Sequence, residues 1–565
     1  MSADGTTRGA SQGRPRLAWL RHVLRRRRAA ALAAIAAVAL ALPALPPTPA
    51  AADLLGLPTS RVILTGPGVP GVTGLVNSLG GQVVFGLPVI NGLVADVPSL
   101  ALNVLGATPG IQVTPDVPVS VADVTALPAS TGPRAPAAVF PASTGASQLV
   151  ARGTTGSGVR VAVLDTGVAR LPDFAGRLVD GVDLSGEGNP FQDSFGHGTF
   201  VAGLIAGNGA SSGGQYMGEA PGADVVSVKV AGSSGSTDMA SVILGVGWVV
   251  DHHASDRIGV LNMSLGAMPF TSTVLNPLDM AVEVAWRSGV AVVASAGNAG
   301  PFNGSILSPG DDPLIITVGA LDDQGTVSAT DDTAAAYSSV GPTNPDGWFK
   351  PDLVASGRSV VSLRVPGSTL DVAHPSARVG AANFVGSGTS FSAAITSGAA
   401  ALALQDGIAA GKPDTLKAKL LGTATAGPIG NPFVDGHGAV NAYWATMAND
   451  VSLNQTTPLI PALPGLTVSL ANTWDGSAWD GTTWNGSAWN GTTWNGTTWN
   501  GTTWNGTTWN GTTWNGTTWN GTTWNGTTWN GTTWNGTSWN GTTWNGTTWN
   551  GTTWNGTTWN GSQWN

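Results

Sequence analysis

The sequence predicts an α/β fold in which helices cover both faces of a parallel sheet. Its central part contains short, mostly apolar runs, and such runs are typical of strands that are buried on both faces. Segments of helical length separate them, which is the connection that parallel strands require. The strands are expected over Val159–Leu164, Asp224–Val230, Ile258–Met263 and Val290–Ser295, and the helices over Thr199–Ala206, Thr237–His253 and Val274–Ser288.

The 565 residues include no cysteine. This excludes disulfides, thiolate catalysis and cysteine-ligated zinc. The folded part of the chain therefore depends on a large apolar core, and about 300 residues of α/β sequence suffice to form one. The composition also changes sharply along the chain, so that its parts have to be interpreted separately.

Residues 1–52 have the pattern of a signal peptide. Four arginines, Arg25–Arg28, precede an apolar run over Ala29–Leu42, and small residues follow up to Ala52. Fourteen apolar residues are too few for a membrane anchor, which needs about 20. We therefore expect export and cleavage near Ala52, with a secreted or cell-surface product. This segment holds eight arginines and one acidic residue, so its removal changes the net charge from −9 to −16. The acidic balance argues against a nucleic-acid partner.

Residues 53–121 are expected to form a small α+β domain. Short β-rich runs alternate with Gly/Pro turns, and one helix-like stretch passes through Leu75 and Leu79. Residues 122–147, which are rich in Pro, Ala, Ser and Thr, are expected to form an exposed linker that can be cut. The β-rich runs are Arg61–Thr65, Gln82–Phe85, Gly92–Val97 and Ile111–Val119.

After a linker at 448–472, residues 473–565 form a low-complexity tail of Trp-Asn-Gly-Thr-Thr repeats. From Trp474 to Trp564, tryptophan stands at every fifth position and accounts for 19 of the 24 tryptophans. We favour a weakly ordered, turn-rich tail, because Gly-rich polar sequence offsets its ordering entropy poorly. The alternative is a β-solenoid-like stack in which each repeat lays its Trp on the Trp of the next repeat. A period of five does not match the two-residue pleat of a strand.

Three short motifs at expected strand or helix ends supply an acid, a base and a nucleophile. They are Asp-Thr-Gly with Asp165, His-Gly-Thr with His197, and Gly-Thr-Ser with Ser390. A serine hydroxyl becomes a good nucleophile only when an imidazole accepts its proton, and a carboxylate must orient that imidazole. Asp-Thr-Gly also occurs in aspartic proteases, but their chemistry needs two carboxylates, and this chain has no second such triplet. The sequence thus predicts a catalytic triad.

Asn298 ends the run after the fourth expected strand. Its side-chain amide can donate a hydrogen bond to the oxyanion that forms during acyl transfer. A helix that starts at Ser390 would add backbone N–H groups and the positive end of its dipole. These features predict an oxyanion hole.

The order Asp, His, Ser with these local sequences resembles the subtilisin family of serine proteases, the subtilases. The resemblance covers about 300 residues, and we assign the catalytic domain to residues 148–447. Phe200, Ser392 and Ala394 depart from the family pattern without removing a catalytic group. The similar blocks are Val159–Gly167, His197–Gly203, Asn262–Gly266, Ala294–Asn298, Lys350–Gly357, Gly386–Ala394 and Gly436–Ala445.

The resemblance implies a substrate site as well as a fold. It implies a backbone edge that pairs with substrate as an added strand, and a wall of the pocket for the residue before the scissile bond. The wall contains no charged residue, so a neutral, apolar side chain is expected there. No cofactor is expected, and no metal, because Asn208–Tyr216 does not match the family's calcium loop. The edge residues are Ser264, Leu265 and Gly266, and the wall residues are Ala294, Ser295, Ala296 and Gly297.

The predicted function is that of a secreted serine endopeptidase that acts on polypeptides through an acyl-enzyme on Ser390. Residues 53–121 resemble the family's inhibitory propeptide, which implies a self-processing precursor with its own propeptide as intramolecular inhibitor. One alternative is a surface-adhesion protein, in which an inactive protease scaffold carries a tail that binds cell wall or polysaccharide. Another is peptide ligation, which uses the same four groups.

Overall fold

The computed structural model describes residues 58–121, 138–405 and 412–448, and the backbone of the short strands β19–β36 between residues 473 and 560. The predicted signal peptide, most of the linker at 122–147 and nearly all of the linker at 448–472 lie outside these ranges. None of the helices in the described ranges combines the length and the apolar character needed to cross a membrane.

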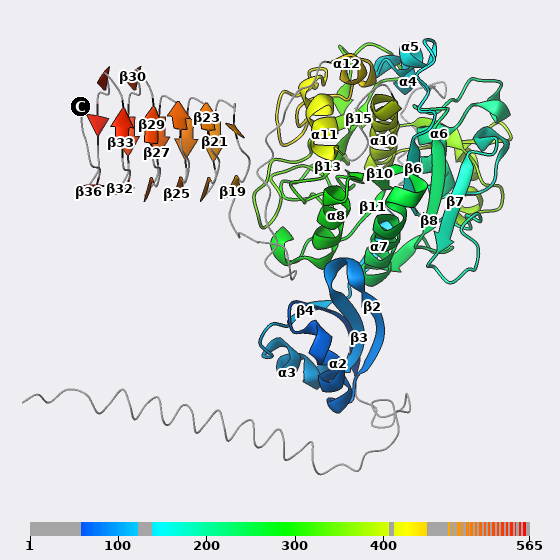
Figure 1. Ribbon diagram of the computed structural model, residues 1–565. Helices are drawn as coiled ribbons and strands as arrows, with labels where there is room; N and C mark the ends of the chain where they lie inside the picture. The colour runs from blue at the N-terminus through cyan, green and yellow to red at the C-terminus, as the bar shows by residue number, and fades with distance from the viewer. Residues whose placement is uncertain are drawn as a thin grey trace, which may run out of the picture.

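A mostly parallel sheet forms the centre of the larger domain (Figure 1). Its strands follow the order β14-β13-β12-β10-β6-β8-β7, and β15 also pairs with β13. All pairs are parallel except β13 with β14. The expected α/β class is therefore confirmed. The strands are β6 (Arg160–Asp165), β7 (Leu178–Asp183), β8 (Asp224–Lys229), β10 (Ile258–Met263), β12 (Ala291–Ser295), β13 (Ile316–Asp322), β14 (Thr333–Ala334) and β15 (Leu353–Ser356).

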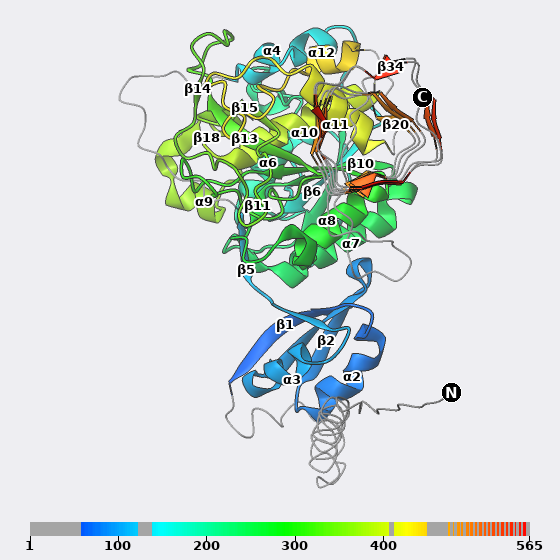
Figure 2. The same cartoon turned by 90° about the vertical axis from the view of Figure 1, so that its left-hand side faces the viewer.

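Helices cover both faces of this sheet (Figures 1 and 2). The helices α7 and α8 pack against each other on one face, whereas α6 and α10 contact each other on the opposite face. The main helices of this domain are α6 (His197–Ala206), α7 (Met239–Asp256), α8 (Pro277–Arg287), α10 (Thr389–Gln405), α11 (Pro413–Gly422) and α12 (Ala442–Met447).

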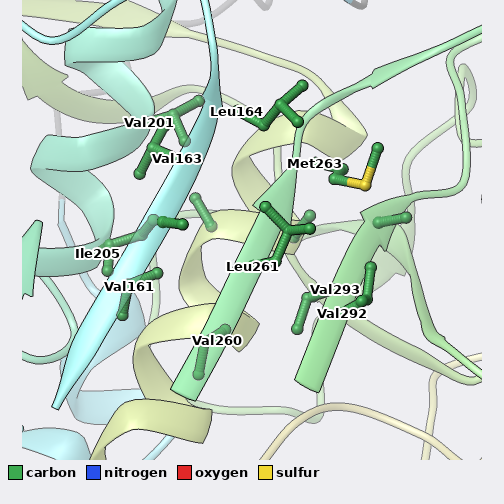
Figure 3. Packing of buried hydrophobic residues seen from close by; sticks show 14 of the residues in the cluster. Val161, Val163, Leu164, Val201, Ile205, Val260, Leu261, Met263, Val292 and Val293 are labelled. Carbon is green, nitrogen blue, oxygen red and sulfur yellow. The ribbon is translucent and has the colours of Figure 1, made fainter. Parts of the chain in front are cut away.

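The apolar runs of the sequence become the core. Figure 3 shows Val161 and Val163 of β6 beside Val201 and Ile205 of α6, and Leu261 of β10 lies on the next strand. All five side chains are fully buried. Helices cover both faces of the strands, so the side chains on either face contact apolar helix residues and not solvent. This explains the unbroken apolar runs in the sequence.

Two helices begin later than the sequence pattern predicts, because their first residues act as caps. Asp238 accepts a hydrogen bond from the N–H of Ser241 at 2.7 Å, so α7 starts at Met239 rather than at residue 237. Asn276 accepts from the N–H of Leu278 at 3.0 Å, and α8 starts one residue later with a proline. Capping side chains satisfy N–H groups that the first turn leaves unpaired.

The N-terminal domain is a separate α+β unit with its own apolar core. Four strands form a sheet in the order β2-β3-β1-β4, and its pairs are antiparallel. Val62 and Leu64 of β1 are buried against Val72 and Val76 of the helix α2. The elements are β1 (Thr59–Thr65), α2 (Val69–Ser78), β2 (Gln82–Leu87), β3 (Gly92–Pro98), α3 (Leu102–Gly106) and β4 (Gln112–Pro115).

This domain contacts the layer of the larger domain that α7 and α8 form. The 3-10 turn η2 (Pro88–Ile90) contacts both α7 and α8, and Ile90 is fully buried there. An oxygen of Asp116 accepts from the N–H of Ala240 at 3.0 Å, and the carbonyl of Val117 accepts from Met239 at 3.0 Å. The N-terminal domain therefore caps α7, because these N–H groups have no partner within the helix.

The linker predicted at 122–147 extends too far toward the C-terminus, because its last residues belong to helices of the larger domain. The helices α4 (Phe140–Ser143) and α5 (Ala146–Val150) pack into the core of the larger domain. Phe140 is 1% exposed and Leu149 is fully buried. Small and proline-rich composition suggested an exposed segment, but these two large apolar side chains anchor its last residues.

The tail strands pair in parallel and in register. Thr473 pairs with Ala488, 15 residues further on, and Thr513 pairs with Thr533, 20 residues further on. In consequence Trp474 lies opposite Trp489 in the register. This pairing resembles the solenoid alternative in its parallel stacking rather than the weakly ordered tail that we favoured. It joins repeats that are three or four apart, however, and not consecutive repeats as that alternative predicted. Each strand has only two or three residues, so the period of five does not have to match a continuous pleat.

Candidate active site

Asp165 and His197 form a buried pair at the carboxyl end of the sheet. Asp165 is the last residue of β6, and His197 is the first residue of α6. The Nδ1 atom of His197 lies 2.9 and 3.0 Å from the two carboxylate oxygens of Asp165. Both side chains are fully buried. A carboxylate in this position fixes the imidazole tautomer and stabilises the imidazolium form.

Asp193 holds these two motifs together, and the sequence analysis missed it. Its carboxylate accepts from the hydroxyl of Thr166 at 2.8 Å and from the N–H groups of Gly196 and Thr199 at 2.7 and 2.8 Å. The Thr166 hydroxyl in turn accepts from the N–H of Gly198 at 2.9 Å. The motif containing Asp165 is thereby fixed to the start of α6. The position of Asp193, shortly before His197 in the sequence, could have indicated this role.

Ser390 is the second residue of α10 and is 1% exposed. Its hydroxyl donates to the carbonyl of Ser264 at 3.1 Å, and the Ser264 hydroxyl donates to the Ser390 carbonyl at 2.8 Å. Nε2 of His197 has no hydrogen-bond partner among the residues that the structure describes. The acid–base half of the predicted triad is thus joined, whereas the serine is bonded to the substrate edge.

Asn298 follows β12 and lies beside the nucleophile loop. Its amide oxygen accepts from both the N–H and the hydroxyl of Thr389, each at 2.9 Å. A Cβ atom added at Gly388 would lie 3.4 Å from the Asn298 Nδ2 atom. The two bonds to Thr389 orient the amide, so that its donor nitrogen lies next to the residues that precede Ser390. The role of this nitrogen as a donor to an oxyanion stays a prediction.

The predicted substrate edge is already paired with a strand. The strand β5 (Pro118–Val121) lies between β11 (Leu265–Gly266) and β9 (Ser236–Asp238) and is antiparallel to both. The N–H of Val121 also donates to the carbonyl of Gly235 at 3.0 Å. Figure 2 shows β5 entering the larger domain from the N-terminal domain, beside β11. A segment of the chain itself therefore occupies the groove by β-augmentation.

The predicted pocket wall lies at the end of β12, next to Asn298. Ala294 and Ser295 are the last residues of the strand, and Ala296 and Gly297 follow. All four are buried. Gly297 has a φ of 107°, a conformation that favours glycine, and its N–H donates to the Thr389 hydroxyl at 3.1 Å. The wall is thus tied to the loop that carries the nucleophile.

A hollow adjoins His197. Apolar side chains including Leu363, Phe384 and Phe391 line it, and the Arg364–Asp371 ion pair lies at its edge. Hydrogen bonds from Arg364 hold the pKa of Asp371 well below its ordinary value. Within the described ranges, no group of three or more His, Asp or Glu side chains is arranged to hold a metal ion.

The sequence of this chain is similar to those of known proteins. The model of the protein family described as "Subtilase family" matches residues 156–438, about half of the chain. Serine protease AprX of Bacillus subtilis is 43% identical over 293 residues, which are 51% of this chain and 66% of AprX. Subtilisin Savinase of Lederbergia lenta is 35% identical over 295 residues, which are 52% of this chain and 93% of Savinase. The chain thus spans just under two thirds of the length of AprX.

A solved structure supports the fold. Fervidolysin from Fervidobacterium pennivorans, a keratinolytic enzyme related to subtilisin, matches with a TM-score of 0.54 and 23% identity. The match covers 70% of this chain and 62% of fervidolysin, and at this identity it bears on the fold alone. The family match goes further, because residues 156–438 include Asp165, His197 and Ser390. The chain belongs to the subtilase family, and residues 156–438 form a subtilisin-type serine endopeptidase domain.

Proposed function

We propose that the chain is the precursor of a secreted serine endopeptidase that removes its own N-terminal domain. The observation that carries this proposal is the position of β5, which fills the groove between β9 and β11 beside Ser264. A peptide in this groove presents its backbone next to the nucleophile, as a substrate does.

In the proposed reaction, Nε2 of His197 accepts the proton of the Ser390 hydroxyl while Asp165 holds Nδ1. The serine oxygen attacks the carbonyl carbon of the scissile peptide, and a tetrahedral oxyanion forms. The Asn298 amide and the N–H of Ser390 donate to that oxygen. His197 then gives the proton to the leaving amine. Water, deprotonated by the same imidazole, hydrolyses the acyl-enzyme and regenerates Ser390.

The register of β5 points to the bond that is cut. Val121 pairs with Leu265 and Ser120 with Gly266, so one further step along the antiparallel register assigns Ala122 to the position opposite Ser264. The carbonyl of Ser264 accepts the hydroxyl of Ser390 at 3.1 Å. Residue 122 itself lies outside the described residues. We infer from this register that the first cleavage falls between Ala122 and Asp123.

The contacts of the N-terminal domain suit an inhibitor that stays bound after the cut. The turn η2 is buried on α7 and α8, and Asp116 and Val117 cap α7. These contacts do not depend on the Ala122–Asp123 bond. The released domain would thus keep β5 in the groove until it dissociates or is degraded.

Expression of the full chain and of Ser390→Ala in a protease-deficient host tests this proposal. We expect the unaltered chain to yield an N-terminal fragment that ends at Ala122, as identified by mass spectrometry early in processing. The Ser390→Ala chain should remain uncut. A first fragment with another C-terminus would refute the proposed site, and normal maturation of the variant would refute self-processing.

The adhesion alternative assigns the fold no catalytic role and makes the tail the functional part. The buried Asp165–His197 pair argues against it, because an inert scaffold has no need for that pair. Labelling of Ser390 with a serine-directed phosphonate separates the two. Ligation would require an amine rather than water to resolve the acyl-enzyme, and product analysis with an added peptide amine distinguishes it.

A further inference from the structure

We propose that Leu307 limits the residue before the scissile bond to a side chain of about the size of alanine. This inference rests on the proposed function and names the specificity of the same site. The sequence predicts only a neutral, apolar side chain in that pocket, because Leu307 belongs to none of the motifs.

Backbone hydrogen bonds fix residue 307 between the two walls of the pocket. The N–H of Leu307 donates to the carbonyl of Ala296 at 2.9 Å. The next residue, Ser308, exchanges two bonds of 2.9 Å with Ala267, which directly follows the substrate edge. The chain at 307 thus joins the edge formed by residues 264–266 to the wall formed by residues 294–297.

The side chain of Leu307 occupies the space that both walls face. A Cβ atom added at Gly297 would lie 2.6 Å from its Cγ atom, and one added at Gly266 would lie 2.9 Å from its Cβ atom. Both distances are below van der Waals contact. The glycines therefore leave room on either side, and the half-buried Leu307 fills part of it. A large side chain inserted between these walls would have to displace the leucine.

The chain's own sequence at the groove agrees with this restriction. The β5 register assigns Ala122 to the position before the proposed scissile bond. Larger apolar residues stand two and four positions before that bond, where Val121 is 3% exposed and Val119 is fully buried. The expected preference is thus alanine at the first position, with valine accepted at the second and fourth.

Peptides with the sequence of residues 118–124 test the proposal, with the residue at 122 set to Ala, Leu or Phe. For the mature enzyme we expect kcat/KM to be at least about tenfold higher for Ala than for Phe, since a pocket that rejects extra methylene groups discriminates on this scale. In Leu307→Gly, the Phe-to-Ala ratio should rise by about tenfold or more. Leu307→Ala, which disturbs the backbone less, should change it in the same direction. Val327→Gly, in an exposed loop, is the matched control and should leave the ratio unchanged.

The outcomes separate this inference from the function on which it rests. If phosphonate labels Ser390 but the unaltered enzyme cleaves the Phe peptide as fast as the Ala peptide, the role of Leu307 is refuted and the protease remains. An unchanged ratio in both Leu307 variants refutes it equally. If no peptide is cut and Ser390 is not labelled, the proposed function is refuted, and the proposed specificity, which rests on it, is refuted as well.

Discussion

The hydroxyl of Ser390 donates to the carbonyl of Ser264, 3.1 Å away, rather than to His197. Ser264 directly precedes the strand β11, against which β5 pairs. The nucleophile and the substrate edge are therefore in direct contact while the groove is filled by the chain's own strand. Activation requires the hydroxyl to exchange this carbonyl for the imidazole, because a carbonyl cannot accept a transferable proton in acyl transfer.

Replacing Ser390 with Ala should abolish hydrolysis of short peptides. Because the variant is expected to stay uncut, the unaltered chain and the variant are compared after an added protease has removed the N-terminal domain from both and has itself been removed. In subtilisin itself, loss of the nucleophile lowers kcat by about 10⁶-fold. Because Ser390 is buried and its hydroxyl makes one neutral hydrogen bond, the variant should fold normally. Steady-state kinetics, with circular dichroism as the control for folding, provides the measurement. Residual activity within a factor of ten would exclude Ser390 as the nucleophile.

Replacing Asn298 with Leu should lower kcat by about 10²–10³-fold with little change in KM, a magnitude taken from subtilisin itself. The amide donates mainly to the transition state, so binding of the ground state should not depend on it. Leu also removes the acceptor for Thr389, and the melting temperature must therefore be measured alongside kcat. A loss seen only in KM would contradict the oxyanion role.

Replacing Asp193 with Ala should reduce both kcat and stability, although Asp193 belongs to none of the three motifs. The change leaves the buried N–H groups of Gly196 and Thr199 without an acceptor, at about 1–3 kcal/mol for each. It also frees the loop that positions Asp165 relative to His197. Asp193→Asn keeps one acceptor oxygen, so its kcat and its stability should lie between those of the unaltered protein and those of Asp193→Ala. If kcat per labelled active site is unchanged in Asp193→Ala, the residue serves stability alone.

The sequence predicted the parts of the site that are local and missed those that depend on distant contacts. The strand and helix patterns located β6 and most of α6, and the three short motifs marked Asp165, His197 and Ser390. The bonds from Asp193 to Thr166 span 27 residues, and the contacts of Leu307 with Gly266 arise only in the folded chain. The tail pairing was misjudged for the same reason, because residues 15 or 20 apart meet there.

Glu219 should make stability fall as the pH rises from about 4.5 to about 8. It is fully buried before β8, and burial raises its pKa from 4.5 to about 8, with the Thr144 hydroxyl acting in the opposite direction. The folded state thus favours the protonated form. The stability that this provides is complete below pH 4.5 and is lost as the pH rises through 8. Glu219→Gln, which is neutral and of equal size, should flatten the loss of melting temperature between pH 4.5 and 8. A parallel loss in both proteins would assign it to other groups.

Deleting residues 473–565 should leave hydrolysis of a short peptide unchanged. The last described element of the catalytic domain is α12, which ends at Met447. Within the part of the chain that the structure describes, the tail strands pair with one another and not with the central sheet. No tail residue is therefore needed to complete the sheet or to hold Asp165, His197 and Ser390. Retention on cell-wall material should fall instead, since the repeats place many tryptophans on one chain, and weak contacts multiply through effective concentration.

The comparison of the full chain with the deletion needs a further variant, in which the tail keeps its length but loses its tryptophan rings. Replacing its tryptophans with serine provides this control, and both variants should release the enzyme into the soluble fraction at equal peptide-hydrolysing activity. Loss of activity on short peptides after the deletion would show that the tail belongs to the catalytic unit. Unchanged retention of both variants would show that attachment, if it occurs, depends on the catalytic domain.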